Sequence, residues 1–304
     1  LTSLTSCKEK HFINDVEYRN QVHKDYLERR ELAKGRENQL FSVMDNGDIT
    51  LEEREALEFL YAYMPFSDLA DRDGDFYLEQ VRSAFEARDF FSWGNTIPED
   101  VFRHFVLVYR VNNENLDTAR MVFFDELKDR IKDMSMYDAA LEVNHWCHEK
   151  VAYRPSDSRT SSPLATIKTS YGRCGEESTF TVTAMRAVGI PARQCYTPRW
   201  AHTDSNHAWV EVWIDGKWYY LGACEPDARL DMGWFSFPST RAMMVHSNAF
   251  GKYKGTEEVN HQTNLFSRVN MLGNYTEAKK VTVNVIDEVG KPVPDAVVDF
   301  KLYN

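Results

Sequence analysis

The sequence predicts an α+β protein in which a helix carrying a cysteine packs on a small antiparallel sheet. Apolar residues recur at helical spacing through about residues 12–134. A second helical pattern starts at Gly172-Arg-Cys174 and stops at Gly189-Ile-Pro191. Alternating residues then flank a two-residue Asp215-Gly216 loop, the strongest short-range signal for a β-hairpin. Helices followed by strands are typical of the α+β class.

Residues 12–134 are expected to form a helical domain behind a disordered N-terminus, residues 1–11. Its best signal is the capping box Thr50-Leu-Glu-Glu53, which precedes an apolar stripe at helical spacing. Further helices are predicted over 76–91, 98–109 and 117–133.

Residues 135–279 are expected to form the catalytic core. Ser135 can start a helix that runs to about Lys150, and a polar loop follows, with a short helix from Pro163. Cys174 then opens the next helix, where unpaired N–H groups and the helix dipole favour a thiolate. We therefore expect a thiol pKa below the ordinary value of about 8.5. Residues 192–197 are expected to form the first strand, and His207 to start the hairpin.

Three stretches in this region resemble the transglutaminase-like superfamily: Tyr171-Gly-Arg-Cys-Gly175, Gly189-Ile-Pro-Ala-Arg193 and His207-Ala-Trp-Val-Glu-Val212. The resemblance spans roughly residues 135–235 and implies a papain-like transglutaminase core without a cofactor. In it Cys174 would attack an amide carbonyl to form a thioester, and His207 would accept and return the proton.

Bacterial members of this superfamily are more often hydrolases, so the resemblance implies a protease or amidase. A chain that resolves the thioester with a lysine amine would instead crosslink proteins. Two further alternatives are an inactive module that holds peptide or glycan in the same cleft, and a structural surface protein. The expected partner is a peptide, protein or glycopeptide substrate.

The third catalytic group is where this chain departs from the resemblance. Members usually place an aspartate four residues after the tryptophan that opens the second hairpin strand, and here Trp218 is followed at that spacing by Gly222. An unbroken register sets His207 opposite Cys224 and turns Glu225 to the other face. A bulge near Gly222 would turn Glu225 toward His207, so we predict that Glu225 orients the imidazole. A backbone carbonyl, Asp204 or no orienting group are the alternatives.

Aromatic and imidazole side chains beside the predicted nucleophile and base are candidates for contact with substrate. They are Tyr171, Trp200, His202 and Trp209. An aromatic residue that anchors a loop is an equally good interpretation of Trp200.

Composition excludes several classes of function. The chain has 36 basic and 47 acidic residues, a net charge of −11 and no basic run, which argues against nucleic acid as a partner. Its five cysteines lack C-x-x-C spacing, and no apolar run approaches the roughly 18 residues of a membrane span.

The sequence argues against two kinds of metal site. His145, Cys147 and His148 point in different directions on a helix, so packing is expected there rather than a metal centre. The acidic stretches 45–48 and 71–75 lack the ligand spacing of an EF-hand, which favours helix-capping turns over calcium sites.

The two ends of the chain carry signals of their own. Leu4-Thr-Ser-Cys7 resembles the lipobox of bacterial lipoproteins, which implies export and a lipid anchor at Cys7, in the periplasm or on the cell surface. An ordinary polar N-terminus is the alternative.

Residues 280–304 change to a period of two from Val281 onward and are similar to the opening of an immunoglobulin-like carboxypeptidase regulatory-type module. Two strands cannot bury a sandwich core, so we expect the native chain to continue past Asn304.

Overall fold

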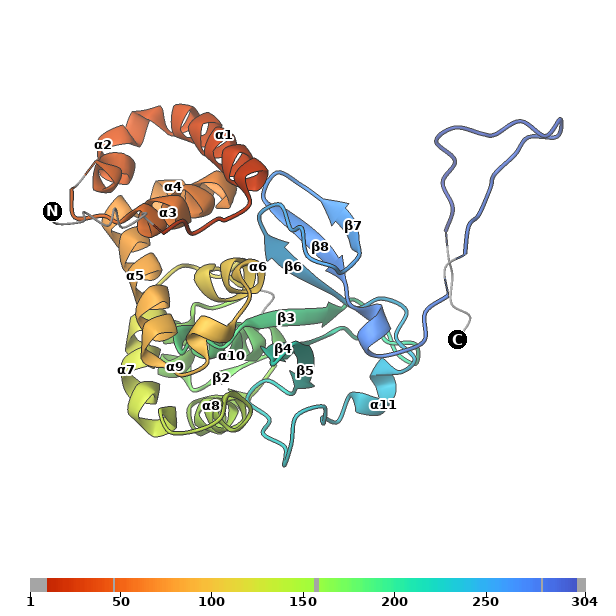
Figure 1. Ribbon diagram of the computed structural model, residues 1–304. Helices are drawn as coiled ribbons and strands as arrows, with labels where there is room; N and C mark the ends of the chain where they lie inside the picture. Colours follow the sequence, from red (N-terminus) through yellow and green to blue (C-terminus); the bar gives the residue numbers. More distant parts are fainter. Residues whose placement is uncertain (1–9, 46, 156–158, 280, 300–304) are drawn as a thin grey trace, which may run out of the picture.

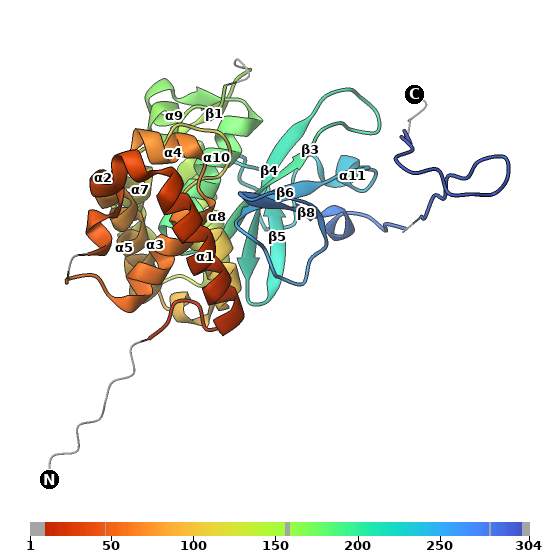
Figure 2. The same cartoon turned by 90° about the horizontal axis from the view of Figure 1, so that it is seen from above.

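The computed structural model describes residues 10–45, 47–155, 159–279 and 281–299. Figures 1 and 2 show helices from the first part of the chain gathered beside a sheet formed by the second part. This mixed α+β arrangement, with a helical N-terminal region and an antiparallel sheet, is the one that the sequence predicts.

The first part of the chain is helical, as expected. Thr50 and Glu53 form the predicted capping box, in which the Thr50 hydroxyl accepts a hydrogen bond from the Glu53 N–H and the Glu53 carboxylate accepts one from the Thr50 N–H. Aromatic and aliphatic side chains from this region form a continuous buried cluster. The helices are α1 (Val16–Leu32), α2 (Glu37–Phe41), α3 (Leu51–Tyr63), α4 (Phe66–Asp71), α5 (Gly74–Phe90), α6 (Glu99–Phe102), a π-helical turn over Arg103–Leu107, and α7 (Ala119–Ile131).

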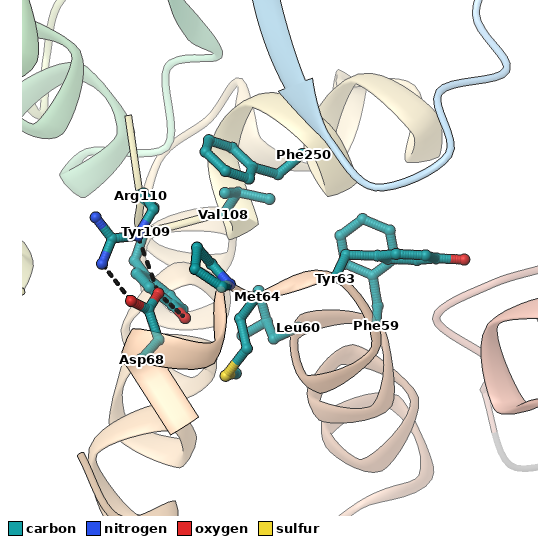
Figure 3. Close-up of a pocket in the computed structure, with 10 residues that line it drawn as sticks. Phe59, Leu60, Tyr63, Met64, Asp68, Val108, Tyr109, Arg110 and Phe250 are labelled. Atoms are coloured by element: carbon teal, nitrogen blue, oxygen red, sulfur yellow. Dashed lines mark hydrogen bonds and ion pairs between the residues drawn. The ribbon is translucent and has the colours of Figure 1, made fainter. Parts of the chain in front are cut away.

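A buried ion pair lies where the helical region meets the sheet. Figure 3 shows Asp68 of α4 facing Arg110, beside a small apolar pocket that Phe250 also lines. The Arg110 Nε donates to Asp68 Oδ2 over 2.9 Å, and the Tyr109 hydroxyl donates to the same oxygen over 3.2 Å. The carboxylate therefore has matched donors although only 1% of Asp68 is exposed.

The helix that carries Cys174 is the centre of the second part of the chain. This helix, α10 (Cys174–Ala187), is buried at every position from Gly175 to Ala187. A helix buried on all sides needs cover from several elements. Here the cover includes α5, α7, α8 (Met136–Lys150), α9 (Pro163–Thr169) and the sheet. The short strand β2 (Tyr171–Gly172), paired in parallel with β1 (Ala152–Tyr153), leads into α10.

The sheet has six antiparallel strands in the order β5-β4-β3-β6-β8-β7. Strand β3 (Ala192–Thr197) and the hairpin of β4 (His207–Ile214) and β5 (Lys217–Leu221) lie where the sequence predicts them. The outer strands extend the sheet through a region for which the sequence predicts only a mixed structure, without defined elements. They are β6 (His246–Phe250), β7 (Val259–Gln262) and β8 (Phe266–Asn270), with the short helix α11 (Ser236–Ser239) before them.

The hairpin confirms the predicted loop but corrects the register beyond it. Ile214 pairs with Lys217 across Asp215 and Gly216, whose φ angles of 48° and 92° suit a two-residue turn. Pairing then stops at Val210 and Leu221, so the predicted bulge near Gly222 is wrong, and the unbroken register that would set His207 opposite Cys224 does not form either.

The reason for the early end is a side chain from α8. Asn144 donates to the Gly222 carbonyl over 2.9 Å and accepts the Cys224 N–H over 3.0 Å. These backbone groups are therefore taken by Asn144. The chain folds into a tight turn in which the Glu225 N–H bonds the Gly222 carbonyl over 3.2 Å.

Residues 281–299 form an exposed arm that leads away from the sheet (Figure 1). Ile286 and Pro292 make an isolated antiparallel bridge in it, and Val281 is 73% exposed. The β domain predicted over 280–304 stays a prediction. Cys7 and its lipobox-like stretch lie outside the described residues, among which no helix is long and apolar enough to span a membrane.

Candidate active site

The start of α10 is held by side chains on both sides of Cys174. The Glu176 carboxylate accepts the Arg173 backbone N–H over 3.0 Å, which caps the first turn. A Cβ at residue 175 would stand 2.2 Å from the Arg173 guanidinium, and one at residue 172 would stand 2.6 Å from Glu176. The flanking glycines thus make room for the cap that fixes the cysteine.

Cys174 lines a cleft of about 720 Å³ between the start of α10 and the start of β4. The structure brings five of the predicted site residues together on its wall: Cys174, His207, Glu225, Trp200 and His202. The other lining residues are Tyr153, Pro155, Arg173, Glu177, Thr203, Asp204, Ser205, Asn206, Ala208, Ala223 and Trp234.

The thiol of Cys174 is held in its neutral form. Burial raises its pKa above the ordinary value, and Glu177 acts in the same direction. The backbone N–H groups of Ala208 and Gly175 and the charge of Arg173 oppose the rise without cancelling it. The expectation of a lowered thiol pKa is therefore wrong, because desolvation of the sulfur exceeds the effect of the helix start.

Aromatic rings surround the imidazole of His207. Its ring centroid is 4.6 Å from that of Trp234, 5.4 Å from that of Phe235 and 5.8 Å from that of Trp209. Burial lowers the pKa of His207 to about 4, so the imidazole is neutral near pH 7. Its Nε2 is buried without a hydrogen-bond partner among the described residues, which leaves Nδ1 to exchange a proton in the cleft.

Glu225 reaches the cleft but does not bond to Nε2 of His207. Its carboxylate takes a hydrogen bond from Trp234, and its Oε2 lies 2.8 Å from where a Cβ on residue 222 would stand. The carboxylate thus bonds Trp234 rather than Nε2 of His207, and the orienting role of Glu225 stays a prediction. The physical reason is the turn after Leu221, which folds Glu225 back over Gly222 and leaves Trp234 in contact with both side chains.

Trp209 packs against the ring of His207 and is buried away from substrate. It is 0% exposed, stacks on His207 with an interplanar angle of 22°, and donates from Nε1 to the Tyr275 hydroxyl over 2.7 Å. Tyr275 in turn donates to Glu211 over 2.6 Å, and Arg193 pairs with Glu211 at 2.7 Å. The prediction that Trp209 contacts substrate is wrong in this structure. Tyr171 is 37% exposed and does not line the cleft.

The sequence did not single out Glu177 and Trp234 as residues of the cleft. Glu177 follows Cys174 by three residues on a helix, so the two side chains share a face, and this spacing is the signal that could have found it. Trp234 comes from the loop after β5, whose path over His207 no local pattern predicts. Among the described residues no group of three or more His, Cys, Asp or Glu could hold a metal ion.

Comparison with known families matches residues 125–223 to the family described as the transglutaminase-like superfamily. The match contains Cys174 and His207 and ends before Glu225. No curated protein matches the chain.

Among solved structures, the chain is similar to one described as "a Putative Cysteine Protease from Cytophaga hutchinsonii", at 17% identity and a TM-score of 0.28. The similarity covers 52% of this chain and 64% of that protein, so the chain spans less than two thirds of it.

Proposed function

We propose, from the premise that residues 125–223 are a transglutaminase-like superfamily domain, that this chain hydrolyses amide bonds through a thioester on Cys174. One observation carries the proposal. Cys174, at the start of a buried helix, and His207, at the start of β4, line the same cleft. A nucleophile and a base presented by rigid elements to one cavity are the minimum that acyl transfer requires.

The reaction starts from a neutral pair. The thiol pKa is raised and the pKa of His207 is lowered to about 4, so the resting dyad is thiol and imidazole rather than thiolate and imidazolium. Nδ1 of His207 takes the thiol proton as sulfur attacks the carbonyl carbon. The new C–S bond replaces the C–N bond, and the same proton leaves with the amine.

Water completes the cycle. His207 removes a proton from a water molecule that attacks the thioester, the C–S bond breaks, and the proton returns to sulfur as the carboxylic acid departs. The Cys174 N–H at the helix start can stabilise the oxyanion in both steps. Peptides, proteins and glycopeptides are the substrates that we propose, and crosslinking by a lysine amine is the competing outcome at the second step.

An acylation assay tests this function without a known substrate. p-Nitrophenyl acetate should give a burst of one p-nitrophenolate per chain, and peptide mapping should find one acetyl group on Cys174. Cys174→Ala should abolish the burst, and His207→Ala should slow it by about 10²- to 10⁴-fold because the general base is lost. His261→Ala is the matched control, since His261 is an exposed imidazole on β7.

The second step separates hydrolase from transferase. Released acetate in the presence of excess cadaverine supports hydrolysis, whereas N-acetylcadaverine as the main product supports amine transfer. A chain with no burst, or with a burst that Cys174→Ala retains, would contradict the proposed function and favour the alternative of a binding module.

A further inference from the structure

Glu177 is a buried carboxyl group that faces the cleft without a partner. It lies one helical turn after Cys174 on α10, is 3% exposed and lines the same cavity. Within the part of the chain that the structure describes, no hydrogen bond or ion pair satisfies its carboxylate. Its oxygens are not among the buried atoms without a partner, so they are open to the cleft, and a donor that enters the cleft would stabilise the ionised form.

A second carboxyl group lines the same cleft from another element. Glu225 lies on the turn after β5, lines the cleft and is close enough to disfavour the charge on Glu177. Burial raises the pKa of Glu177 to about 8, with Glu225 and Glu176 acting in the same direction.

The cationic side chains near Glu177 and Glu225 are engaged by other groups. Arg173 belongs to the cap at Glu176, and Arg199 pairs with Asp204. His148 binds the Cys224 carbonyl and favours the charge on Glu225 only, while Asp227 disfavours it. The pair of carboxyl groups thus lacks the positive charge that the junction pair of Asp68 and Arg110 has.

We propose that Glu177 and Glu225 form a subsite for a positively charged amine of the substrate, next to the amide that Cys174 attacks. An ammonium group would supply the donors and the charge that both carboxylates lack. The ring of Trp234, which already bonds Glu225, offers a face for the same cation. The inference rests on the proposed function and narrows its substrate class to amides that carry a free amine near the scissile bond.

Alkylating reagents of different charge test the subsite directly. The probes are iodoacetamide, which is neutral, (2-bromoethyl)trimethylammonium, which is a cation at every pH, and iodoacetate, which is an anion. Each rate at Cys174 is divided by the rate of the same reagent with free cysteine. We expect the cation to be favoured over the neutral reagent by at least tenfold and the anion to be disfavoured, with the preference growing from pH 7 to pH 9 as Glu177 ionises.

Substitution assigns the preference to the two carboxyl groups. The double variant Glu177→Gln with Glu225→Gln should bring the ratio of cation to neutral reagent to within twofold of that of free cysteine. Asp204→Asn is the matched control, because it removes the same charge from the cleft wall at a side chain that is 84% exposed and paired with Arg199. The control should retain the wild-type ratio. Equal ratios in the wild-type chain and the double variant would overturn the subsite.

A second measurement does not depend on a reactive thiol. Cadaverine should raise the melting temperature of Cys174→Ala by several degrees, and n-pentanol at the same concentration should not. The shift should vanish when Glu177 and Glu225 are also replaced by Gln. A shift with n-pentanol equal to that with cadaverine would show that a protonated Glu177 binds neutral groups, and the subsite for a cation would be wrong. If the acylation assay fails while cadaverine still raises the melting temperature, the proposed function is wrong and the cation subsite stands.

Discussion

Asp68 and Glu177 are buried to nearly the same extent, with 1% and 3% of their surfaces exposed, yet their surroundings differ. Asp68 lies at the junction of the helical region and the sheet, where Arg110 and Tyr109 satisfy it (Figure 3). Glu177 lies in the cleft, where Glu225 and Glu176 raise its pKa further. A buried acid with a built-in partner holds two parts of the chain together. A buried acid without a partner lowers the stability of the fold, and we attribute the presence of Glu177 to ligand binding.

The same contrast appears between the cleft and the layer beneath it. Below His207, the hydrogen bonds from Trp209 through Tyr275 to Glu211 are all satisfied. At the cleft itself, the carboxyl group of Glu177 has no hydrogen-bond partner among the described residues. Polar groups that support the site are therefore fixed by the fold, whereas those that face the cleft remain available for chemistry.

The largest loss of stability is expected where the helical region meets the sheet, at Asp68. Asp68→Asn should lower the free energy of unfolding by about 3 to 5 kcal/mol, because the buried Arg110 then keeps only Glu114, at 3.8 Å, as a counter-charge. Urea unfolding at pH 7 measures the change, with the exposed Asp71→Asn at the end of the same helix as control. A loss below about 1 kcal/mol is the size expected for an exposed ion pair and would contradict a stabilising role for this buried pair.

Replacement of Glu177 should raise the free energy of unfolding, whereas replacement of Asp68 lowers it. Its folded pKa of about 8 exceeds the unfolded value of about 4.3, so the folded chain holds a proton that the unfolded chain has released between those two pH values. Stability is therefore lost as pH rises through this window, and Glu177→Gln removes the loss.

We expect the variant to gain roughly 4 to 5 kcal/mol at pH 8, because each pKa unit of the shift is worth about 1.4 kcal/mol, and almost nothing at pH 4. Urea unfolding of both chains across this range gives the difference curve. A Glu177→Gln chain that is less stable than wild type at pH 8 would show that Glu177 has a structural role like that of Asp68.

A smaller effect is expected in the layer below the cleft. Tyr275→Phe removes the acceptor of the Trp209 N–H and should cost about 1 kcal/mol, since a buried donor loses its bond. Because Trp209 stacks on His207, the alkylation rate of Cys174 should fall a few-fold as well. Tyr253→Phe is a useful comparison, because it removes a hydroxyl bond to Glu257 away from His207. Equal effects of both changes on Cys174 would rule out a positioning role for Tyr275.

Local signals were enough to predict much of the fold. The capping box at Thr50, the Asp215-Gly216 turn and the stop at Gly189 each depend on a few adjacent residues, and the structure contains all three. Strands β6, β7 and β8 were not predicted, because their short polar segments become strands only by pairing with one another and with β3.

The site could be predicted in part for the same reason. Sequence placed Cys174 and His207 at the starts of a helix and a strand, and both line the cleft. The position of Glu225 and the pKa of Cys174 depend on groups distant in sequence, namely Asn144, which ends β5 early, and Ala208, whose backbone N–H bonds the sulfur. Desolvation in particular is a property of the folded surroundings that no local pattern contains.

Alkylation of each cysteine as a function of pH tests the central claim, that Cys174 is the nucleophile and His207 its base, most directly. Cys147, Cys195 and Cys224 are at most 2% exposed, whereas Cys174 faces the cleft. We predict that iodoacetamide modifies Cys174 first, that its rate rises through a pKa above about 8.5, and that His207→Ala slows it near pH 7. A native chain in which Cys174 reacts no faster than Cys195 or Cys224, or in which His207→Ala leaves its rate unchanged, would contradict the account.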